Sequence, residues 1–279
     1  MIDQARMTGS MSEVVAQVTD ELQRFRLDGR VAVVTGGTGG IGSRLCEAFA
    51  RVGARVVVHG RDHGRAAALA DRLRDAGGQA APIVGDLTRR DDADRLVDET
   101  LATFGRVDVI VNTVGGGAGD ALHPAESYPE EAWDRIFDLN LRSTLLPTQA
   151  AVRAMIAGGQ GGRVLHFSSV RGQLGIDNGF SAYVAAKGAL DALTRQQATE
   201  WAKHQITVNT ISPTFVATAQ SASLLADEAF RAGLEARIPL HRIAETDDVV
   251  GASLLLCTDA ASFITGQILT LDGGLTACQ

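Results

Sequence analysis

Tyr183 and Lys187 are the residues of this sequence whose types and spacing suggest acid–base chemistry. They lie four residues apart in a segment, 181–193, that reads as the start of a long helix with Ser181 as its N-cap, which places both on one helix face. A neighbouring ammonium favours the phenolate and lowers the pKa of a tyrosine from its usual value of about 10. Such a phenol can exchange a proton with an alcohol or carbonyl oxygen, although the same spacing is also typical of a solvated helix face.

The length, charge and cysteine content of the chain limit the kind of protein that holds this pair. Its 279 residues allow one large α/β domain or two smaller ones, and a formal net charge of -7 without a block of like charges argues against a nucleic-acid or membrane partner. Cys46, Cys257 and Cys278 are too far apart to suggest a disulfide framework or a metal site. No apolar run approaches the ~20 residues of a membrane helix, and no signal-peptide pattern is present, so a reducing cytoplasm fits best.

Short apolar runs alternate with helical patterns along the chain, which predicts a parallel sheet with helices on both faces. We expect a single doubly wound, Rossmann-type α/β domain over 27–279, a helical extension at 1–26 and a substrate loop at about 214–240. Ligands in such sheets bind beyond the carboxyl ends of the strands. The expected strands are 31–34, 55–59, 80–84, 107–111, 163–167, one from 206, and 268–272. The expected helices are 12–25, 45–52, 63–77, 90–104, 133–154, one from 181, a mobile segment at 222–237, and one from Asp247.

A glycine-rich turn, residues 35–42, joins the first expected strand to the first expected helix. Glycines there let the backbone approach a diphosphate, and the helix N-terminus offers free N–H groups. Glycines also form ordinary loops, but their position between strand and helix favours phosphate binding.

Arg61 and Asp86 follow the second and third expected strands. An acidic residue near the end of the second strand holds ribose hydroxyls, whereas an arginine accommodates a 2′-phosphate, so Arg61 favours NADP over NAD. The alternative is a solvated arginine paired with Asp62. Asp86 could accept a hydrogen bond from an adenine amino group or cap the helix that starts near Arg90.

The motifs in their order resemble those of the short-chain dehydrogenase/reductase family over about residues 28–274. Two departures affect the cofactor side: Thr214 replaces the usual glycine after the proline, and Gly39 stands where NADP users often carry a basic residue, which leaves the argument for NADP to Arg61 alone. A third departure is Thr113-Val114 in a motif that often reads Asn-Ala-Gly. The matching motifs are Thr35-Gly36-xxx-Gly40-Ile41-Gly42, Asp86-Leu87, Asn112-xx-Gly115, Asn140, Ser169, Tyr183-xxx-Lys187, Asn209-xxx-Pro213, Ile264-Thr-Gly266 and Asp272-Gly-Gly274.

The resemblance implies a role for each matching residue. Ser169 would polarise the substrate oxygen, with Ser168 the weaker candidate, Tyr183 would pass the proton, Lys187 would lower the pKa of the tyrosine and hold the nicotinamide ribose, and Asn140 would position a water. The residues implied to line the cofactor are Gly36, Thr38, Gly40 and Ile41 at the phosphates and ribose, Asp86 and Leu87 at the adenine, Asn112 at the ribose, and Pro213 to Val216 at the nicotinamide.

The implied function is reversible hydride transfer between NADP, or NAD, and a carbonyl or secondary alcohol, without a metal. Residues 188–209 and 213–216 look similar to the gluconate 5-dehydrogenase and polyol dehydrogenase group, which points to a sugar acid or polyol, and Arg171 could face an acidic substrate. A 3-oxoacyl or other ketone reductase, an epimerase or dehydratase, and a catalytically silent cofactor-binding regulator are the alternatives. Homo-tetramers are usual for the family, with the helices around Asn140 and Lys187 as contact faces.

Overall fold

Seven parallel strands form one sheet at the centre of the computed structural model, which describes residues 21–116, 122–177 and 179–278. Their order across the sheet is β3-β2-β1-β4-β5-β6-β7, so the direction of winding reverses between β1 and β4. The expected doubly wound architecture is confirmed. The strands are β1 Val31–Thr35, β2 Arg55–Gly60, β3 Gln79–Val84, β4 Val109–Asn112, β5 Gly162–Phe167, β6 Ile206–Pro213 and β7 Ile268–Leu271.

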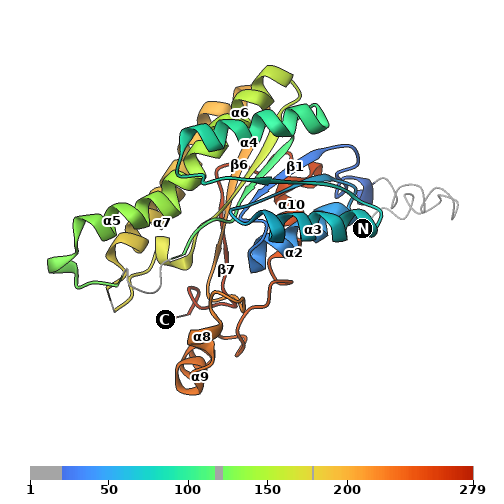
Figure 1. Cartoon of the computed structure of the whole chain (residues 1–279). Coiled ribbons are helices and arrows are strands. Elements are labelled where there is room, and N and C mark those ends of the chain that lie inside the picture. The colour runs from blue at the N-terminus through green and yellow to red at the C-terminus, as the bar shows by residue number, and fades with distance from the viewer. Residues whose placement is uncertain (1–20, 117–121, 178, 279) are drawn as a thin grey trace, which may run out of the picture.

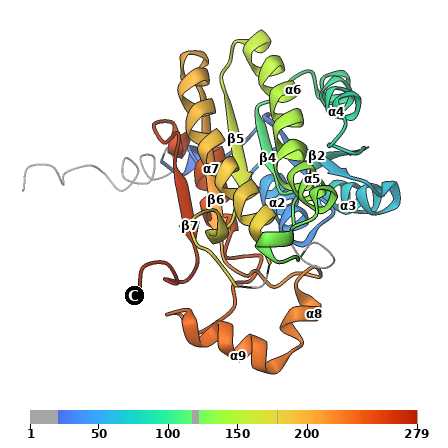
Figure 2. The same cartoon turned by 90° about the vertical axis from the view of Figure 1, so that its left-hand side faces the viewer.

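Helices cover both faces of this sheet (Figure 1). One face carries α2, α3 and α10, and the other carries α4, α6 and α7, as the two buried apolar clusters show. The short α8 and α9 extend below the body of the molecule beyond β6 (Figure 2). The α-helices are α2 Gly40–Arg51, α3 His63–Asp75, α4 Arg90–Phe104, α5 Glu130–Phe137, α6 Ser143–Gly158, α7 Ser181–Trp201, α8 Ala222–Leu225, α9 Glu228–Arg237 and α10 Val250–Cys257. The shorter turns are η2 Ala125–Ser127, the π-turn η3 Asp138–Arg142, η4 Val170–Gly172, η5 Ala202–His204 and η6 Asp259–Ala261.

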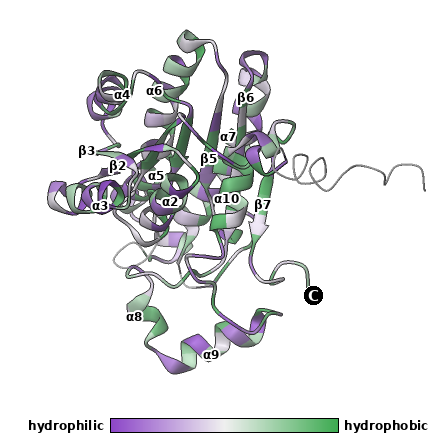
Figure 3. Cartoon of the chain, turned by 90° about the vertical axis from the view of Figure 1, so that its right-hand side faces the viewer, coloured by the Kyte–Doolittle hydropathy of each residue, from purple (hydrophilic) through white to green (hydrophobic). Residues whose placement is uncertain are grey.

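Alternation along each strand explains why both helix layers are needed. Ala32 and Val34 of β1 belong to the cluster under α2 and α10, whereas Val31 and Val33 belong to the cluster under α4 and α6. The central strands are therefore apolar on both faces, as expected for a buried parallel sheet. Figure 3 shows this as apolar colour along the sheet and on α10, while α9 alternates between polar and apolar residues.

Two predicted helix starts are wrong. Ser181 is the first residue of α7 rather than its N-cap, because the carbonyl of Phe180 already accepts the first helical hydrogen bond, from the N–H of Val184. The helix expected from Asp247 begins at Val250, because residues 245–248 form a turn in which the carboxylate of Asp248 accepts from the N–H of Glu245.

Most of the expected N-terminal helix, 12–25, lies outside the described residues. From residue 21 onwards the chain makes a last helical turn, and the carbonyl of Arg24 accepts from the N–H of Ala260 beside α10. Within the described part of the chain, no helix combines the length and apolar character needed to cross a membrane.

Candidate active site

Ser169, Tyr183 and Lys187, here called the reactive cluster, meet at the carboxyl edge of the sheet. Ser169 follows β5, while Tyr183 and Lys187 lie on the first two turns of α7. The hydroxyl of Ser169 lies close enough to that of Tyr183 to lower the pKa of the phenol, and Nζ of Lys187 lies 5.7 Å from the centroid of the Tyr183 ring. The Ser169 hydroxyl after β5 and the Lys187 ammonium on α7 therefore both lie beside the Tyr183 phenol.

The pKa of Tyr183 is raised above its usual value, mainly because of burial. The hydroxyl of Ser169 and the charge of Arg171 act in the opposite direction without compensating for it. The phenol is therefore held in its protonated form at neutral pH. Lys187 is not among the groups that shift this pKa in the chain by itself, and its ammonium donates to the carbonyl of Phe167 at 2.9 Å. That Lys187 lowers the pKa of Tyr183 stays a prediction.

The pKa of Lys187 is also shifted. The residue is only 3% exposed, and burial lowers its pKa to about 8, with the carboxylate of Asp191 one turn further along α7 acting in the opposite direction. A buried ammonium with one main-chain acceptor is poorly solvated, which leaves N–H donors for another partner.

The two serines after β5 face different partners. The hydroxyl of Ser168 donates to the carbonyl of Lys187 at 3.2 Å and is buried inside the fold. The hydroxyl of Ser169 lies against Tyr183 and also accepts from the N–H of Arg171 at 3.1 Å. Of the two, Ser169 is the one placed beside the phenol.

Asn140 lies in the π-turn η3 and is fully buried. Its side-chain oxygen accepts from the N–H of Gly116 at 2.9 Å, and its amide donates to the Gly116 carbonyl at 2.8 Å. A Cβ on Gly115 would come within 2.9 Å of this oxygen and 3.2 Å of Nζ of Lys187, so Asn140 and the reactive cluster converge on the glycine turn after β4. Whether Asn140 also positions a water stays a prediction.

The glycine turn between β1 and α2 provides the features that a diphosphate needs. The N-cap of α2 is Gly39, which has no side chain to accept a hydrogen bond from the N–H groups of the first helical turn. Those N–H groups can therefore bind an anion such as a diphosphate. Gly36 has a φ of +67°, and a Cβ on Gly42 would lie 2.2 Å from the Gly36 carbonyl oxygen, so neither position accommodates a larger residue. Ile41 packs its side chain against the core beside this turn.

Arg61 is exposed directly after β2 and forms no ion pair with another described residue. The sequence reasoning missed its neighbour Arg65, which donates to the carbonyl of Thr38 at 2.7 Å across the glycine turn. The side chain of Thr38 in turn lies against Gly60, where a Cβ would be 2.7 Å from its hydroxyl. Asp62 accepts from the N–H of Arg65 as the N-cap of α3 and does not pair with Arg61.

Asp86 and Leu87 differ in what they can offer a ligand. One carboxylate oxygen of Asp86 accepts from the N–H and hydroxyl of Thr88, and the residue is exposed, so it caps this turn rather than α4, whose N-cap is Arg89. Leu87 is 3% exposed and its side chain belongs to the core. The side chain of Leu87 is thus not available to an adenine.

Asn112 belongs to a chain of buried polar groups that we call the buried network: Asn112, Thr148, His166 and Gln197. The amide of Asn112 donates to the Thr148 hydroxyl at 2.9 Å and lies 3.1 Å from Nδ1 of His166, whose Nε2 lies 3.1 Å from the Gln197 side-chain oxygen. These contacts occupy the Asn112 amide, so any contact with a ribose must come from its main chain. Burial lowers the pKa of His166 to about 4.

The loop after β6 packs onto both glycine turns, and this contact was not predicted. A Cβ on Gly40 would lie 2.7 Å from Cγ2 of Thr218, and the side-chain amide of Gln220 donates to the carbonyl of Gly115. Pro213 ends β6, and Val216 forms an isolated parallel bridge with Ala244. A hydroxyl five residues after Pro213 is the sequence signal that could have identified Thr218.

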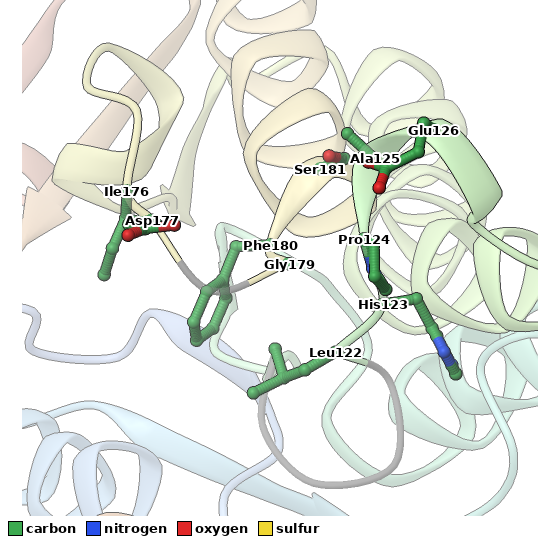
Figure 4. Close-up of a pocket in the computed structure, with 10 residues that line it drawn as sticks. All are labelled: Leu122, His123, Pro124, Ala125, Glu126, Ile176, Asp177, Gly179, Phe180 and Ser181. Carbon is green, nitrogen blue, oxygen red and sulfur yellow. The ribbon is translucent and has the colours of Figure 1, made fainter.

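A cavity of about 490 Å³ adjoins the start of α7 (Figure 4). Residues 122–126 line one side, and residues 176–177 and 179–181 line the other, with Phe180 and Leu122 pointing toward each other. The ring of Phe180 packs edge-on against Tyr183 with 6.3 Å between the ring centroids, so Phe180 contacts both this cavity and the Tyr183 ring.

Comparison with known proteins extends the likeness to nearly the whole chain. A family model described as enoyl-(acyl carrier protein) reductase matches residues 36–276. The chain is 38% identical over 264 residues to an uncharacterised oxidoreductase of Mycobacterium tuberculosis, covering 92% of this chain and 95% of that protein. It is 34% identical over 255 residues to a gluconate 5-dehydrogenase of Gluconobacter oxydans, covering 90% and 96%. The crystal structure of a gluconate 5-dehydrogenase of Burkholderia cenocepacia in complex with NADP and tartrate matches with a TM-score of 0.87 and 34% identity, covering 92% of this chain and 99% of that chain.

Proposed function

The chain belongs to the short-chain dehydrogenase/reductase family of NAD(P)-dependent oxidoreductases, and from this premise we propose that it interconverts a secondary alcohol and a ketone of the sugar-acid or polyol class with NADP. The observation that carries the proposal is the placement of the Ser169 hydroxyl against the Tyr183 phenol, with Lys187 beside the ring. A phenol, a second hydroxyl and an ammonium at the carboxyl edge of a doubly wound sheet are the groups that such a reaction requires.

In the direction of reduction, Tyr183 is the acid. Its raised pKa keeps the proton on the phenol oxygen, from which it passes to the substrate oxygen as negative charge develops there. Ser169 donates a hydrogen bond to the same substrate oxygen. Lys187 has donors left beyond its bond to Phe167 and is proposed to hold the nicotinamide ribose and to stabilise the phenolate that forms. The bound cofactor supplies the hydride.

We propose that the cofactor lies along the carboxyl edge between the two glycine turns. The uncapped start of α2 suits the diphosphate, and Arg61 with Thr38 and Arg65 suits the 2′-phosphate of NADP. A structural relative solved with NADP supports this choice over NAD. The remaining proposed contacts are Gly36, Gly40 and Ile41 at the phosphates and ribose, Asp86 and Leu87 at the adenine, Asn112 at the ribose, and Pro213 and Val216 at the nicotinamide.

The two named gluconate 5-dehydrogenases among the relatives support a sugar acid as substrate. A 3-oxoacyl or other ketone reductase is the second candidate, because the matching family model carries an acyl carrier protein reductase description. A catalytically silent regulator is disfavoured by the complete reactive cluster. A homo-tetramer and a cytoplasmic location remain predictions, which light scattering and fractionation can test.

Absorbance at 340 nm tests the proposal directly. The purified chain should consume NADPH with 5-keto-D-gluconate, and faster than with 3-oxoacyl thioesters or steroid ketones. Arg61→Ala should weaken NADPH binding about 10- to 100-fold and NADH binding little. The reason is that only NADPH carries a 2′-phosphate, to which the Arg61 guanidinium would donate charged hydrogen bonds. Equal losses for both cofactors would show that Arg61 does not read the 2′-phosphate, and cofactor binding without turnover on any carbonyl would favour the regulator.

A further inference from the structure

Two arginines from separate elements lie near the reactive cluster. Arg171 is part of η4 and follows Ser169 by two residues, and Arg237 is the last residue of α9. The pKa of Arg171 is lowered by burial and by the charge of Arg237, and raised by the phenol of Tyr183. Arg171 therefore lies within electrostatic reach of both the Tyr183 phenol and Arg237.

Arg237 is held in this place by the residues that follow it. Ile238 is 2% exposed, and a Cβ on Gly273, just beyond β7, would lie 2.6 Å from its Cγ2. The N–H of Leu240 donates to the carbonyl of Gly273. Because β5, β6 and β7 are parallel neighbours, the end of α9 is fixed at the same carboxyl edge that carries η4.

Within the described part of the chain, neither guanidinium is paired with a carboxylate. Among ion pairs between described residues, none involves Arg171 or Arg237. Arg171 donates from Nη1 to the carbonyl of Gly175 at 2.9 Å, which uses one of its five N–H donors. Arg231, six residues before Arg237 on the same helix, is paired with Glu235 at 2.9 Å.

Arg171 is partly buried and Arg237 is exposed. Two like charges near each other repel, and an anion bound by both removes the repulsion. The planar fork of a guanidinium matches a carboxylate in particular. The cavity beside Phe180 is lined instead by Glu126 and Asp177, whose charges do not suit an acidic group. We propose that Arg171 and Arg237 together bind the carboxylate of the substrate and select a hydroxy or oxo acid over the matching neutral polyol or ketose; this inference rests on the proposed function.

Kinetics with a matched pair of substrates test the selection. 5-Keto-D-gluconate and L-sorbose differ only in a carboxylate in place of a hydroxymethyl group. Arg171→Gln and Arg237→Gln should each lower kcat/KM for 5-keto-D-gluconate about 10- to 100-fold, mostly through KM, and change that for L-sorbose less than about 3-fold. Arg231→Gln is the control and should change neither. Equal losses on both substrates would show that Arg171 only fixes its loop and would overturn the proposal.

Binding separates this proposal from the proposed function. Calorimetry in the presence of NADP should show L-tartrate binding, no binding of its neutral counterpart L-threitol, and a loss of tartrate affinity of about 10-fold or more in both variants but not in Arg231→Gln. If the enzyme reduces neither sugar substrate while tartrate binding depends on both arginines, the substrate class fails and the carboxylate site stands. Tartrate binding that is absent in the wild type, or unchanged in the variants, overturns the site.

Discussion

The buried network and the reactive cluster are both polar, both buried for the most part and both fixed by β5, yet they are built differently. In the buried network each side chain contacts the next, from Thr148 through Asn112 and His166 to Gln197. In the reactive cluster burial outweighs the available partners: the pKa of Tyr183 is raised, and that of Lys187 is lowered to about 8. The carboxylate of Asp191, one turn beyond Lys187, is buried as well, and its pKa is raised by the same burial.

This difference separates two uses of a buried polar group. A satisfied network stabilises one arrangement of strands, since breaking it leaves donors and acceptors without partners. An under-solvated ammonium and a protonated phenol are costly in the chain alone, and they become useful when substrate and cofactor supply the missing partners. The reactive cluster should therefore limit activity, and the buried network should limit stability.

The largest effect is expected for Tyr183→Phe, which removes the acid of the reactive cluster. Turnover should fall about 1,000-fold, while the free energy of unfolding should change by no more than about 1 kcal/mol, because one hydrogen bond is lost. NADPH oxidation at 340 nm and urea unfolding measure the two. Tyr128→Phe, at the only other tyrosine of the chain, is the control and should keep its turnover. Near-native turnover of Tyr183→Phe would contradict the proton role.

His166→Ala should show the opposite pattern. It removes one of the two partners of the Asn112 amide, which keeps Thr148, leaves the Gln197 oxygen without its partner and opens a cavity, so the free energy of unfolding should fall by about 3 kcal/mol. Turnover per folded molecule should stay near that of the wild type. His63→Ala, at an exposed position on α3, should change stability by less than about 0.5 kcal/mol. If His166→Ala keeps its stability but loses turnover, the buried network serves activity rather than stability, and the comparison is wrong.

Lys187→Met should abolish most activity and still make the protein more stable. The folded pKa of Lys187, about 8, lies below its unfolded value of about 10.4, so the ammonium is disfavoured in the folded chain. Allowing for the lost bond to Phe167, the gain at pH 7 should be about 2 kcal/mol. Since the unfolded chain binds more protons between those two values, wild-type stability should rise from pH 8 towards pH 10, and the variant should lack this rise. Urea unfolding at pH 7 and pH 9.5 would measure both.

The smallest expected effect is the loss of folding stability as the pH falls from 7 to 5. His166 is neutral in the folded chain with a pKa of about 4, below the unfolded value of about 6.5, so the unfolded chain binds more protons as the pH falls. Its contribution to stability is complete above about pH 6.5 and is lost towards pH 4, which amounts to about 1 to 2 kcal/mol at pH 5. His59, also buried with a pKa lowered to about 4, adds a similar loss. The His166→Ala variant should therefore show a shallower decline between pH 7 and pH 5 than the wild type; identical slopes would rule out titration of His166.

Much of the fold was predictable because it depends on local patterns. Apolar runs located all seven strands to within a few residues, and the alternation of strands and helices gave the parallel sheet. The resemblance supplied Ser169, Tyr183 and Lys187. The sign of the Tyr183 pKa was missed because spacing on a helix says nothing about burial, which arises only when β5, α7 and η4 pack together.

The contacts between loops were not predictable for a similar reason. Arg65, Thr218 and Arg237 acquire their neighbours only when the exits of β2 and β6 fold over the glycine turns and the end of β7. The partner of Asn140 lies 24 residues earlier in the chain, and no pattern in the sequence connects them.

The π-turn at Asp138–Arg142 also fixes the spacing of its surroundings. The N–H of Ser143 donates to the carbonyl of Asp138, five residues back, so this turn contains one residue more than a regular α-helical turn. The extra residue rotates the side chains of α6 by about 100° about the helix axis relative to those of α5. That offset lets α5 pack against α7 while α6 packs against α4. Removing a single residue there, such as Leu139, would put the two halves out of phase and swing the Asn140 amide away from Gly116. This stretch should therefore accept substitutions far more readily than insertions or deletions.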